Sequence, residues 1–393
     1  MPTDLQRIST THVGSLVRPP ELIAYVRAQI GRTSYDEAAY RKCLSDSVAA
    51  VVKRQVETGI DIVSDGEFGK PHWFRYATQR LGGIEPRPVI GRKPRLFAGR
   101  DRDRFPEFYD EYDKTLDYGA PIVDWIVTGP LKYKGHDVIK RDIENLKRAL
   151  PAGGATQGFL PVVAPASLLP ELKDEYYGSD EKMAFALADA LRDEYRAIAD
   201  AGLIAQIDDA WLPAMYDRMV PPASHADYLK WAEMCVAALN QAVRDIPERL
   251  TRYHICWGSW NGPHTADVPL KELIHLILQL RVGGYSIEGA NPRHEHEWRV
   301  WEQAKLPAGR KLLPGVISHA TNIVEHPELV AQRLVRLAKL VGRENVIGST
   351  DCGFAQGALY QRVHVSIMWA KLAALVEGAA LASRELWGTR NAA

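Results

Sequence analysis

The stretch Arg-Tyr-His-Ile-Cys-Trp-Gly-Ser, residues 252–259, has the pattern of a β-strand that ends in a turn. His254 and Cys256 stand two residues apart, and side chains at that spacing lie on the same face of a strand. An imidazole and a thiol converging at a strand end are ligands that zinc prefers, and catalytic zinc sites use about three protein ligands. The best candidate for a third ligand is Cys352, within the run 349–353. The same residues are equally compatible with packing, as small buried thiols and a hydrogen-bonded histidine.

Short β-rich runs like this one occur eight times along the chain, and helical patterns separate them. In the helical segments apolar residues recur three and four positions apart, as at Leu187, Leu191 and Tyr195. Eight strand–helix units in series are typical of a (β/α)8 or TIM barrel, so we expect one α/β barrel domain over residues 1–393. The predicted strands are 9–14, 61–64, 158–163, 203–207, 252–257, 284–288, 312–317 and 345–348, and the last helix is expected at 358–386.

One segment, about 70–156, interrupts this rhythm. It carries basic and aromatic residues together with an extra strand-like run at 122–128, and it follows the second predicted strand. We expect an insertion that lies over or beside the barrel mouth. Its basic residues are Arg92, Lys93, Arg95, Arg100, Arg102 and Arg104. They are suited to binding an anionic substrate group. Neighbouring acidic residues offset most of their charge, however, and this favours an ordinary surface loop.

The composition is that of an ordinary globular protein. The chain has 393 residues, of which 46% are hydrophobic and 25% charged, and its 49 Lys and Arg equal its 49 Asp and Glu. This balance predicts a small-molecule partner and neither nucleic acid nor a membrane surface. Four cysteines and the lack of a signal-like or 18-residue apolar run predict a reduced, cytoplasmic setting. A homo-oligomer is compatible with a barrel of this kind.

Polar residues follow nearly every predicted strand. Because barrel active sites form at the carboxyl ends of the strands, this pattern favours a functional rim and strengthens the metal interpretation. The residues at the strand ends are His12, Ser15, Asp65, Glu67, Ser167, Asp208, Asp209, His254, Cys256, Glu288, His319, Asp351 and Cys352.

Several of these motifs together resemble the catalytic domain of cobalamin-independent methionine synthase, a barrel of the uroporphyrinogen decarboxylase and methionine synthase group. The matching motifs, in chain order, are Thr-His-Val-Gly-Ser at 11–15, Asp-Gly-Glu at 65–67, Gln-Ile-Asp-Asp at 206–209, His-Ile-Cys at 254–256, Ile-Glu-Gly at 287–289 and Asp-Cys-Gly at 351–353. The runs His-Ile-Cys-Trp-Gly-Ser at 254–259, Pro-Arg-His at 292–294 and Ser-Thr-Asp-Cys-Gly at 349–353 are closest to the epoxyalkane:coenzyme M transferase branch.

The resemblance implies a zinc-dependent transferase. Zinc would be held by the residues that match the family ligands, His254, Cys256 and Cys352, with Glu288 as a displaceable fourth ligand. Glu288 could instead orient His254. A small thiol would bind the metal, lose its proton and attack an electrophilic carbon. Coenzyme M transferase-like thiol alkylation is the first expectation, and a core-type methionine synthase methylating homocysteine is the alternative.

The remaining rim residues receive provisional roles. His12 or His319 would supply a proton to an alkoxide if the electrophile is an epoxide, and Asp208 and Asp65 would hold polar parts of the substrates. Asp65 could equally cap its loop. Residues predicted to contact substrate are Ser15, Glu67, Asp209, Trp257, as an apolar wall, and Arg293, toward a sulfonate.

Two further possibilities stay open from the sequence. His294 and His296 look like a metal-binding pair, but the set above already completes a site. A decarboxylase or lyase of the related barrel group, or a non-catalytic binding barrel, remains an alternative function. Retention of both cysteines and His254 argues against a metal-free decarboxylase.

Overall fold

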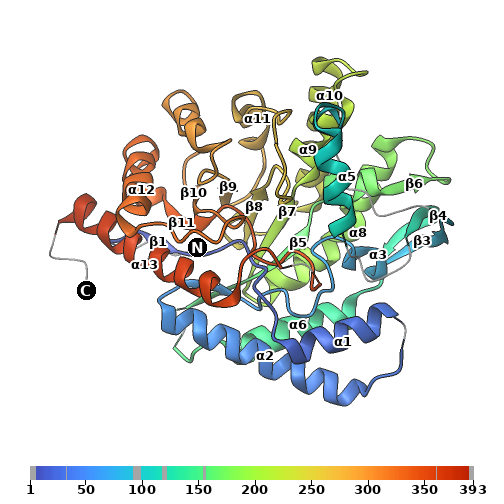
Figure 1. Cartoon of the computed structure of the whole chain (residues 1–393), viewed down its shortest axis with the longest axis horizontal. Coiled ribbons are helices and arrows are strands. Elements are labelled where there is room, and N and C mark those ends of the chain that lie inside the picture. The colour runs from blue at the N-terminus through green and yellow to red at the C-terminus, as the bar shows by residue number, and fades with distance from the viewer. Residues whose placement is uncertain are drawn as a thin grey trace.

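Eight parallel strands form the centre of the computed structural model, which describes residues 6–31, 33–91, 99–116, 122–153, 156–359 and 361–388 (Figure 1). Their order in the sheet is β1-β11-β10-β9-β8-β7-β5-β2. All eight predicted strands and the barrel class are confirmed. The strands are β1 (Ser9–Thr10), β2 (Ile62–Ser64), β5 (Gln157–Val163), β7 (Ile204–Asp209), β8 (Thr251–Ile255), β9 (Gly284–Ile287), β10 (Lys311–Ile317) and β11 (Ile347–Thr350).

Contacts between β1 and β2 bring the two ends of the sheet together. The Asp61 amide donates to the Thr10 carbonyl at 3.2 Å, and the Thr11 hydroxyl donates to the Ile62 carbonyl at 2.9 Å. The interior is filled by side chains from alternate positions of several strands, which is why the barrel is a packed core rather than a pore. One such layer comprises Ile62, Phe159, Ile204, Leu313 and Ile347, all buried.

Helices cover the outside of the barrel (Figure 1). Their ends follow sequence signals: Asp36 accepts hydrogen bonds from the first-turn amides of α2, and Ser224 forms a capping box with Asp227 at the start of α10. The α-helices are α1 (Pro20–Gly31), α2 (Glu37–Thr58), α3 (Tyr76–Arg80), α4 (Arg100–Arg104), α5 (Pro106–Tyr112), α6 (His136–Ala149), α7 (Pro165–Leu168), α8 (Asp180–Asp200), α9 (Trp211–Met219), α10 (His225–Ala242), α11 (Leu270–Ile277), α12 (Pro327–Val341) and α13 (Val365–Trp387). The 3₁₀ helices are η1 (Asp113–Thr115), η2 (Leu169–Glu171), η3 (Glu248–Leu250), η4 (Glu295–Glu302) and η5 (Arg343–Asn345).

The last helix begins later than its alanine-rich sequence predicts. It starts at Val365, capped by His364, because residues 356–358 form backbone hydrogen bonds with residues 71–73 instead of starting a helix. Among the described residues α13 is the one helix long and apolar enough to cross a membrane, but it packs against α12, β1 and β10 as a core helix.

The predicted insertion forms a small sheet beside the barrel (Figure 1). Its strands β3 (Leu81–Pro88) and β4 (Val123–Tyr133) pair antiparallel, and β6 (Leu172–Asp174), from beyond the predicted range, adds a third strand. Helix α6 lies within the range 70–156 but packs on α2 and α8 as an ordinary barrel helix. Of the basic residues, Arg92, Lys93 and Arg95 lie outside the described residues, and Arg102 pairs with Asp113 at 2.9 Å.

Candidate metal centre and substrate cavity

Three potential metal ligands meet at the carboxyl end of the barrel. His254 lies on β8, Cys256 follows that strand directly, and Cys352 follows β11. One ligand atom from each lies within 4.8 Å of the others, and all three side chains are buried. The two Sγ atoms are 3.6 Å apart. The three candidate ligands named from the sequence are therefore brought together by the fold.

The geometry fits a shared zinc ion. Two sulfurs bound to one tetrahedral zinc at about 2.3 Å lie about 3.8 Å apart, close to the separation of the two cysteines. The Nδ1 atom of His254 is 3.2 Å from the Ser286 hydroxyl, whereas its buried Nε2 has no hydrogen-bond partner within the described part of the chain. A buried nitrogen without a partner costs about 1–3 kcal/mol, and a metal ion would remove that cost.

The two thiols differ in their affinity for a proton. The hydrogen bond from Cys256, together with the neighbouring imidazoles, holds the pKa of Cys352 well below its usual range, whereas the same contact and burial raise the pKa of Cys256. The Ser259 hydroxyl lies 3.0 Å from Cys352 Sγ, and the Gly258 amide donates to Cys256 Sγ at 3.3 Å. Hydrogen bonds of this kind stabilise sulfur in its anionic, metal-binding form.

Glu288 lies beside this cluster with both carboxylate oxygens occupied. Oε1 accepts a hydrogen bond from the Trp257 amide at 3.2 Å, and Oε2 accepts one from the Asn291 side chain at 2.8 Å. Burial and nearby Asp351 raise the pKa of Glu288 well above its usual value. In this arrangement Glu288 is outside the three-residue group and borders it, so its role as a ligand stays a prediction.

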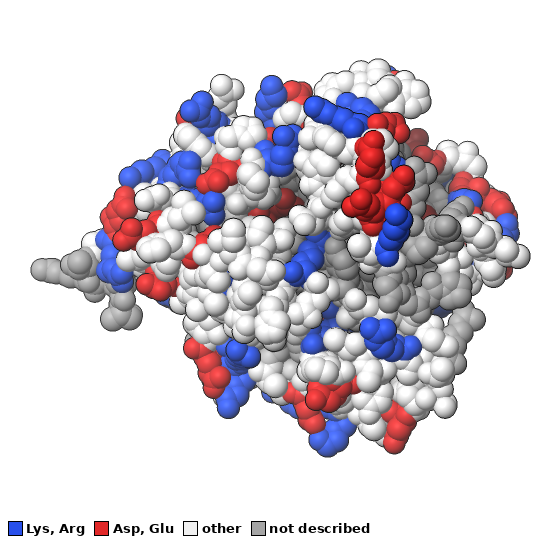
Figure 2. Space-filling model, in the orientation of Figure 1, with Lys and Arg blue, Asp and Glu red and all other residues white. Residues whose placement is uncertain are grey.

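A cavity of about 1200 Å³ opens over the three ligands. The residues lining its inner part include the predicted Ser15, Glu67, Asp208 and Asp209, and its outer part is formed by the inserted sheet and neighbouring loops. Figure 2 shows positive and negative side chains interspersed over one face of the molecule, as the equal numbers of the two signs predict.

Glu67 and Asp208 place two carboxylates in this cavity. Glu67 has the left-handed backbone angle φ 58°, which is uncommon outside glycine and often marks a functional position. Its Oε2 atom is buried and, among the described residues, has no hydrogen-bond partner, although Lys70 Nζ is 4.0 Å away. Burial and the proximity of Glu67 raise the pKa of Asp208 well above its usual value, and burial likewise raises the pKa of Glu67.

Asp209 and Asp65 are committed to protein contacts. Asp209 accepts hydrogen bonds from the Ser167 hydroxyl at 2.8 Å and the Tyr253 hydroxyl at 3.0 Å. Asp65 accepts the Glu67 amide at 2.9 Å, and burial raises its pKa to about 6. The loop-capping alternative for Asp65 thus matches the geometry, since that hydrogen bond shapes the turn that presents Glu67.

The two predicted acid–base histidines occupy different environments. His12 sits inside the barrel, where its Nε2 is 2.7 Å from the Gln55 amide oxygen and its Nδ1 accepts the Gly14 amide. Both nitrogens of buried His319 are without a hydrogen-bond partner in the described ranges. Burial lowers the pKa of each ring to about 4. Neither histidine is among the residues that line the cavity, so the acid–base role of each stays a prediction.

Trp257 and Arg293 are not brought to the cavity. The Trp257 ring is fully buried on the far side of Cys256, where it packs against His294, and Arg293 is exposed. The alternation of a strand does not extend into the turn after Cys256, so the sequence did not fix which way Trp257 points.

Sequence reasoning also missed two residues near the sulfur atoms. Gln356 Nε2 lies 3.9 Å from Cys352 Sγ, and Ser259 contacts both thiols. Trp73 packs against the cluster formed by Val13, Ala210, Cys256 and Cys352. Ser259 belongs to the quoted motif 254–259, which was the one available signal for it. Gln356 comes from a loop whose path no local pattern predicts.

A buried His-Cys-Cys group at the carboxyl rim of a parallel barrel defines a metal-binding barrel enzyme. The family model described as the catalytic domain of cobalamin-independent synthase matches residues 174–375, just over half of the chain. The chain therefore belongs to the cobalamin-independent methionine synthase catalytic-domain family.

The chain is similar to relatives of two named activities. The chain is 24% identical to a methionine synthase of Thermococcus kodakarensis, covering 98% of this chain and 96% of the relative. It is 25% identical to 2-hydroxypropyl-CoM lyase of Xanthobacter autotrophicus, covering 98% of both. A solved B12-independent methionine synthase from Shewanella superposes with a TM-score of 0.72 at 21% identity, over 98% of this chain and all of the other, which confirms the fold.

Proposed function

We propose that this protein transfers a methyl or other alkyl group to the sulfur of a small thiol. The observation that carries the proposal is the convergence of His254, Cys256 and Cys352 beneath a cavity large enough for two substrates. These residues would hold zinc, and bound zinc would supply a Lewis acid that lowers the pKa of a thiol substrate below its free value of about 8.5. Two anionic sulfur ligands keep such a site electron-rich, which favours nucleophilic attack by sulfur.

The carboxylates favour a thiol that also carries an amino group. Glu67 and Asp208 line the cavity near the metal ligands, and the Glu67 Oε2 atom has an acceptor position that no described residue fills. A substrate ammonium group would pair with these carboxylates and stabilise their ionised forms. Homocysteine has this chemistry, and the methionine synthases among the relatives are consistent with it.

Coenzyme M is the second candidate thiol. The closest motif resemblance and the 2-hydroxypropyl-CoM lyase relative favour it, and Arg75 and Arg362 line the same cavity. Its sulfonate, however, would face the carboxylates of Glu67 and Asp208 if it lay beside the metal ligands. The order of the two thiols predicted from the sequence is therefore reversed in our proposal.

The part of the cavity that is lined by aromatic rings and borders the sulfur atoms would receive the electrophile. Trp73, Phe74 and Trp211 form an aromatic wall there, with ring centroids 5.0 Å apart for Trp73 and Phe74 and 6.1 Å for Phe74 and Trp211. An apolar wall excludes water and so limits hydrolysis and side reactions. The proton-donor role of His319 stays a prediction, because His319 is not among the residues that line this cavity.

The proposal is tested by measuring the loss of free thiol in the zinc-reconstituted protein, with homocysteine and coenzyme M supplied in turn. Each thiol is combined with a methyl donor or a short epoxyalkane, and Cys352→Ala serves as the inactive control. We expect homocysteine consumption that depends on zinc and on the donor. Consumption of coenzyme M alone would reverse the assignment of the thiol, and no consumption of either, with zinc bound, would contradict the proposed transfer. The cytoplasmic setting and a homo-oligomeric state stay predictions.

A further inference from the structure

A buried charged cluster lies behind the metal ligands, on the side away from the substrate cavity. At its centre, His294 Nδ1 is 2.8 Å from a Glu297 oxygen and His294 Nε2 is 3.0 Å from an Asp267 oxygen. Although burial opposes the charge, these hydrogen bonds raise the pKa of His294 to about 10. Both ring nitrogens therefore carry hydrogen at neutral pH, and the imidazolium bridges two carboxylates.

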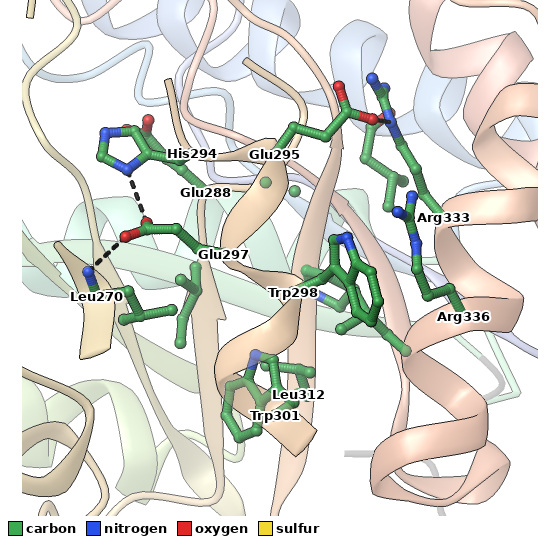
Figure 3. A pocket seen from close by; sticks show the side chains of 16 residues that line it. Leu270, Glu288, His294, Glu295, Glu297, Trp298, Trp301, Leu312, Arg333 and Arg336 are labelled. Atoms are coloured by element: carbon green, nitrogen blue, oxygen red, sulfur yellow. Dashed lines mark hydrogen bonds and ion pairs between the residues drawn. The ribbon is translucent and has the colours of Figure 1, made fainter. Parts of the chain in front are cut away.

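The cluster joins three separate segments. Figure 3 shows His294 and Glu297 facing one another, with the second Glu297 oxygen accepting the Leu270 amide at the start of α11. Asp267 also lies 3.1 Å from His264 Nδ1, and His264 Nε2 is 3.1 Å from the Trp260 carbonyl. The network thus connects η4 to both ends of the loop that runs from Cys256 to α11.

This loop contributes much of the surroundings of the sulfur atoms. It contains Cys256 itself, the Gly258 amide and the Ser259 hydroxyl, which contact the two thiols. Residues 256–269 form neither helix nor strand. The Cys256 amide still donates to the Asp209 carbonyl at 3.1 Å, but among the described residues no backbone–backbone hydrogen bond holds residues 257–268. Their conformation must depend on side-chain contacts.

The contact closest to the metal ligands is made by Trp257. Its ring packs against the His294 ring with centroids 4.3 Å apart and the planes tilted by 31°, and its Nε1 donates to the Val268 carbonyl at 2.7 Å. Its amide, next to Cys256 in the chain, donates to Glu288. A displacement of His294 would therefore be transmitted to the residue adjoining one ligand and to the carboxylate beside the site.

We propose that His294 is a positioning residue, which locks the loop 256–269 between Asp267 and Glu297 and thereby holds Cys256, Ser259 and Glu288 in place around the metal. The predicted effect of His294 on metal binding rests on the proposed zinc site. The predicted effect of His294 on the loop conformation does not depend on that site. In this proposal His294 acts through the loop, whereas in the metal-pair interpretation His294 and His296 would bind a metal directly. The two histidines separate clearly, because His294 is buried and His296 is exposed.

The test compares His294→Gln with His296→Gln. Glutamine is neutral and cannot bridge the two carboxylates as the imidazolium does, whereas the substitution at exposed His296 leaves the cluster intact. Zinc affinity is measured by competition with a chelator. We expect the zinc dissociation constant of His294→Gln to rise at least tenfold, in the range of about 10–100-fold known for residues that orient metal ligands, and that of His296→Gln to remain unchanged.

Two further readouts separate positioning from a general loss of stability. The absorption of the cobalt-substituted protein should change in His294→Gln, because the sulfur ligand geometry changes. Hydrogen exchange in the metal-free protein should rise within 257–268 while the barrel strands keep their protection. Unchanged zinc affinity and unchanged exchange in this loop would overturn the proposal.

Asp267→Asn provides a second route if His294→Gln does not fold. It keeps the size of the side chain and removes one charged partner, and the same rise in zinc dissociation constant and loop exchange is expected. If the wild-type protein did not bind zinc, the proposed metal centre would be contradicted. The positioning role of His294 would still be decided by hydrogen exchange in the loop.

Discussion

Arg252 in the barrel interior and two polar groups at the barrel rim differ in how their hydrogen-bonding atoms are satisfied. In the interior, fully buried Arg252 donates to the Gln206 side chain, the Thr11 hydroxyl and the His12 carbonyl at 2.8, 3.1 and 2.9 Å. At the rim, His254 Nε2 and Glu67 Oε2 are equally enclosed, yet neither has a hydrogen-bond partner among the described residues. Since each such group costs about 1–3 kcal/mol, we infer that interior polar groups stabilise the fold and that rim groups are completed by ligands.

The largest effect, on zinc binding, is expected from substitution of Cys352 at the rim. Cys352→Ala should weaken zinc binding at least about 1000-fold, equivalent to about 4 kcal/mol, and abolish thiol alkylation, because it removes one of three ligands. Cys235→Ala, at a buried position in α10, is the matched control for loss of a thiol. Zinc content after dialysis measures the difference. Equal zinc content in the two variants would contradict the claim that Cys352 at the rim binds zinc and Cys235 in the core does not.

The next largest effect concerns the interior. Arg252→Met should lower the free energy of unfolding of the metal-free protein by about 3 kcal/mol, because it leaves buried acceptors without donors. Arg293→Met, at an exposed position, should change it by less than about 0.5 kcal/mol. Urea unfolding of both variants measures the contrast. Similar stability of the two would show that the interior network contributes little.

A smaller effect separates the two candidate thiols. Glu67→Gln should raise the KM for homocysteine roughly 30- to 100-fold, about 2–3 kcal/mol, because a charged hydrogen bond to the amino group is lost. The KM for coenzyme M, which has no amino group, should not rise. Steady-state kinetics with both thiols measures this. A KM that rises equally for both would argue that Glu67 shapes the cavity instead of binding an ammonium group.

The smallest predicted effect is the pH dependence caused by His12. Burial lowers its folded-state pKa to about 4, below the unfolded value of about 6.5, so the unfolded chain binds the proton more readily. Stability is therefore lost as pH falls from about 6.5 toward 4, by about 2 kcal/mol at pH 5.

His12→Gln tests this assignment, with His364→Gln, at an exposed helix cap, as the control. The decline in unfolding free energy between pH 7 and 5 should be about 2 kcal/mol smaller in His12→Gln than in the wild type, and unchanged in the control. An unaltered decline in His12→Gln would mean that other groups cause the acid sensitivity.

The sequence was sufficient to predict the barrel and the convergence of three candidate ligands, for a physical reason. Strand position is encoded by local apolar runs, and the carboxyl ends of parallel strands meet at one rim, so His254, Cys256 and Cys352 could be placed together without knowing any loop. The start of α13 was predicted too early, because the bridge from Gly357 to His72 overrides the local helix preference.

The remaining features depend on side-chain direction in irregular segments. Trp257 points away from the cavity and Arg293 into solvent, although both follow strand ends. The partners of His294 lie three and 27 residues away along the chain, so no local periodicity connects them. Loops position these groups through contacts between distant segments, which a single sequence does not encode in a readable form.

The most direct measurement of the central claim is the visible absorption of the cobalt-substituted protein during titration with homocysteine. The account predicts one bound ion per chain, the intense absorption of a four-coordinate site with sulfur ligands, and a further change that saturates at one thiol per chain. Failure to bind the metal, or a spectrum that thiol leaves unchanged, would contradict a metal centre that accepts a thiol substrate.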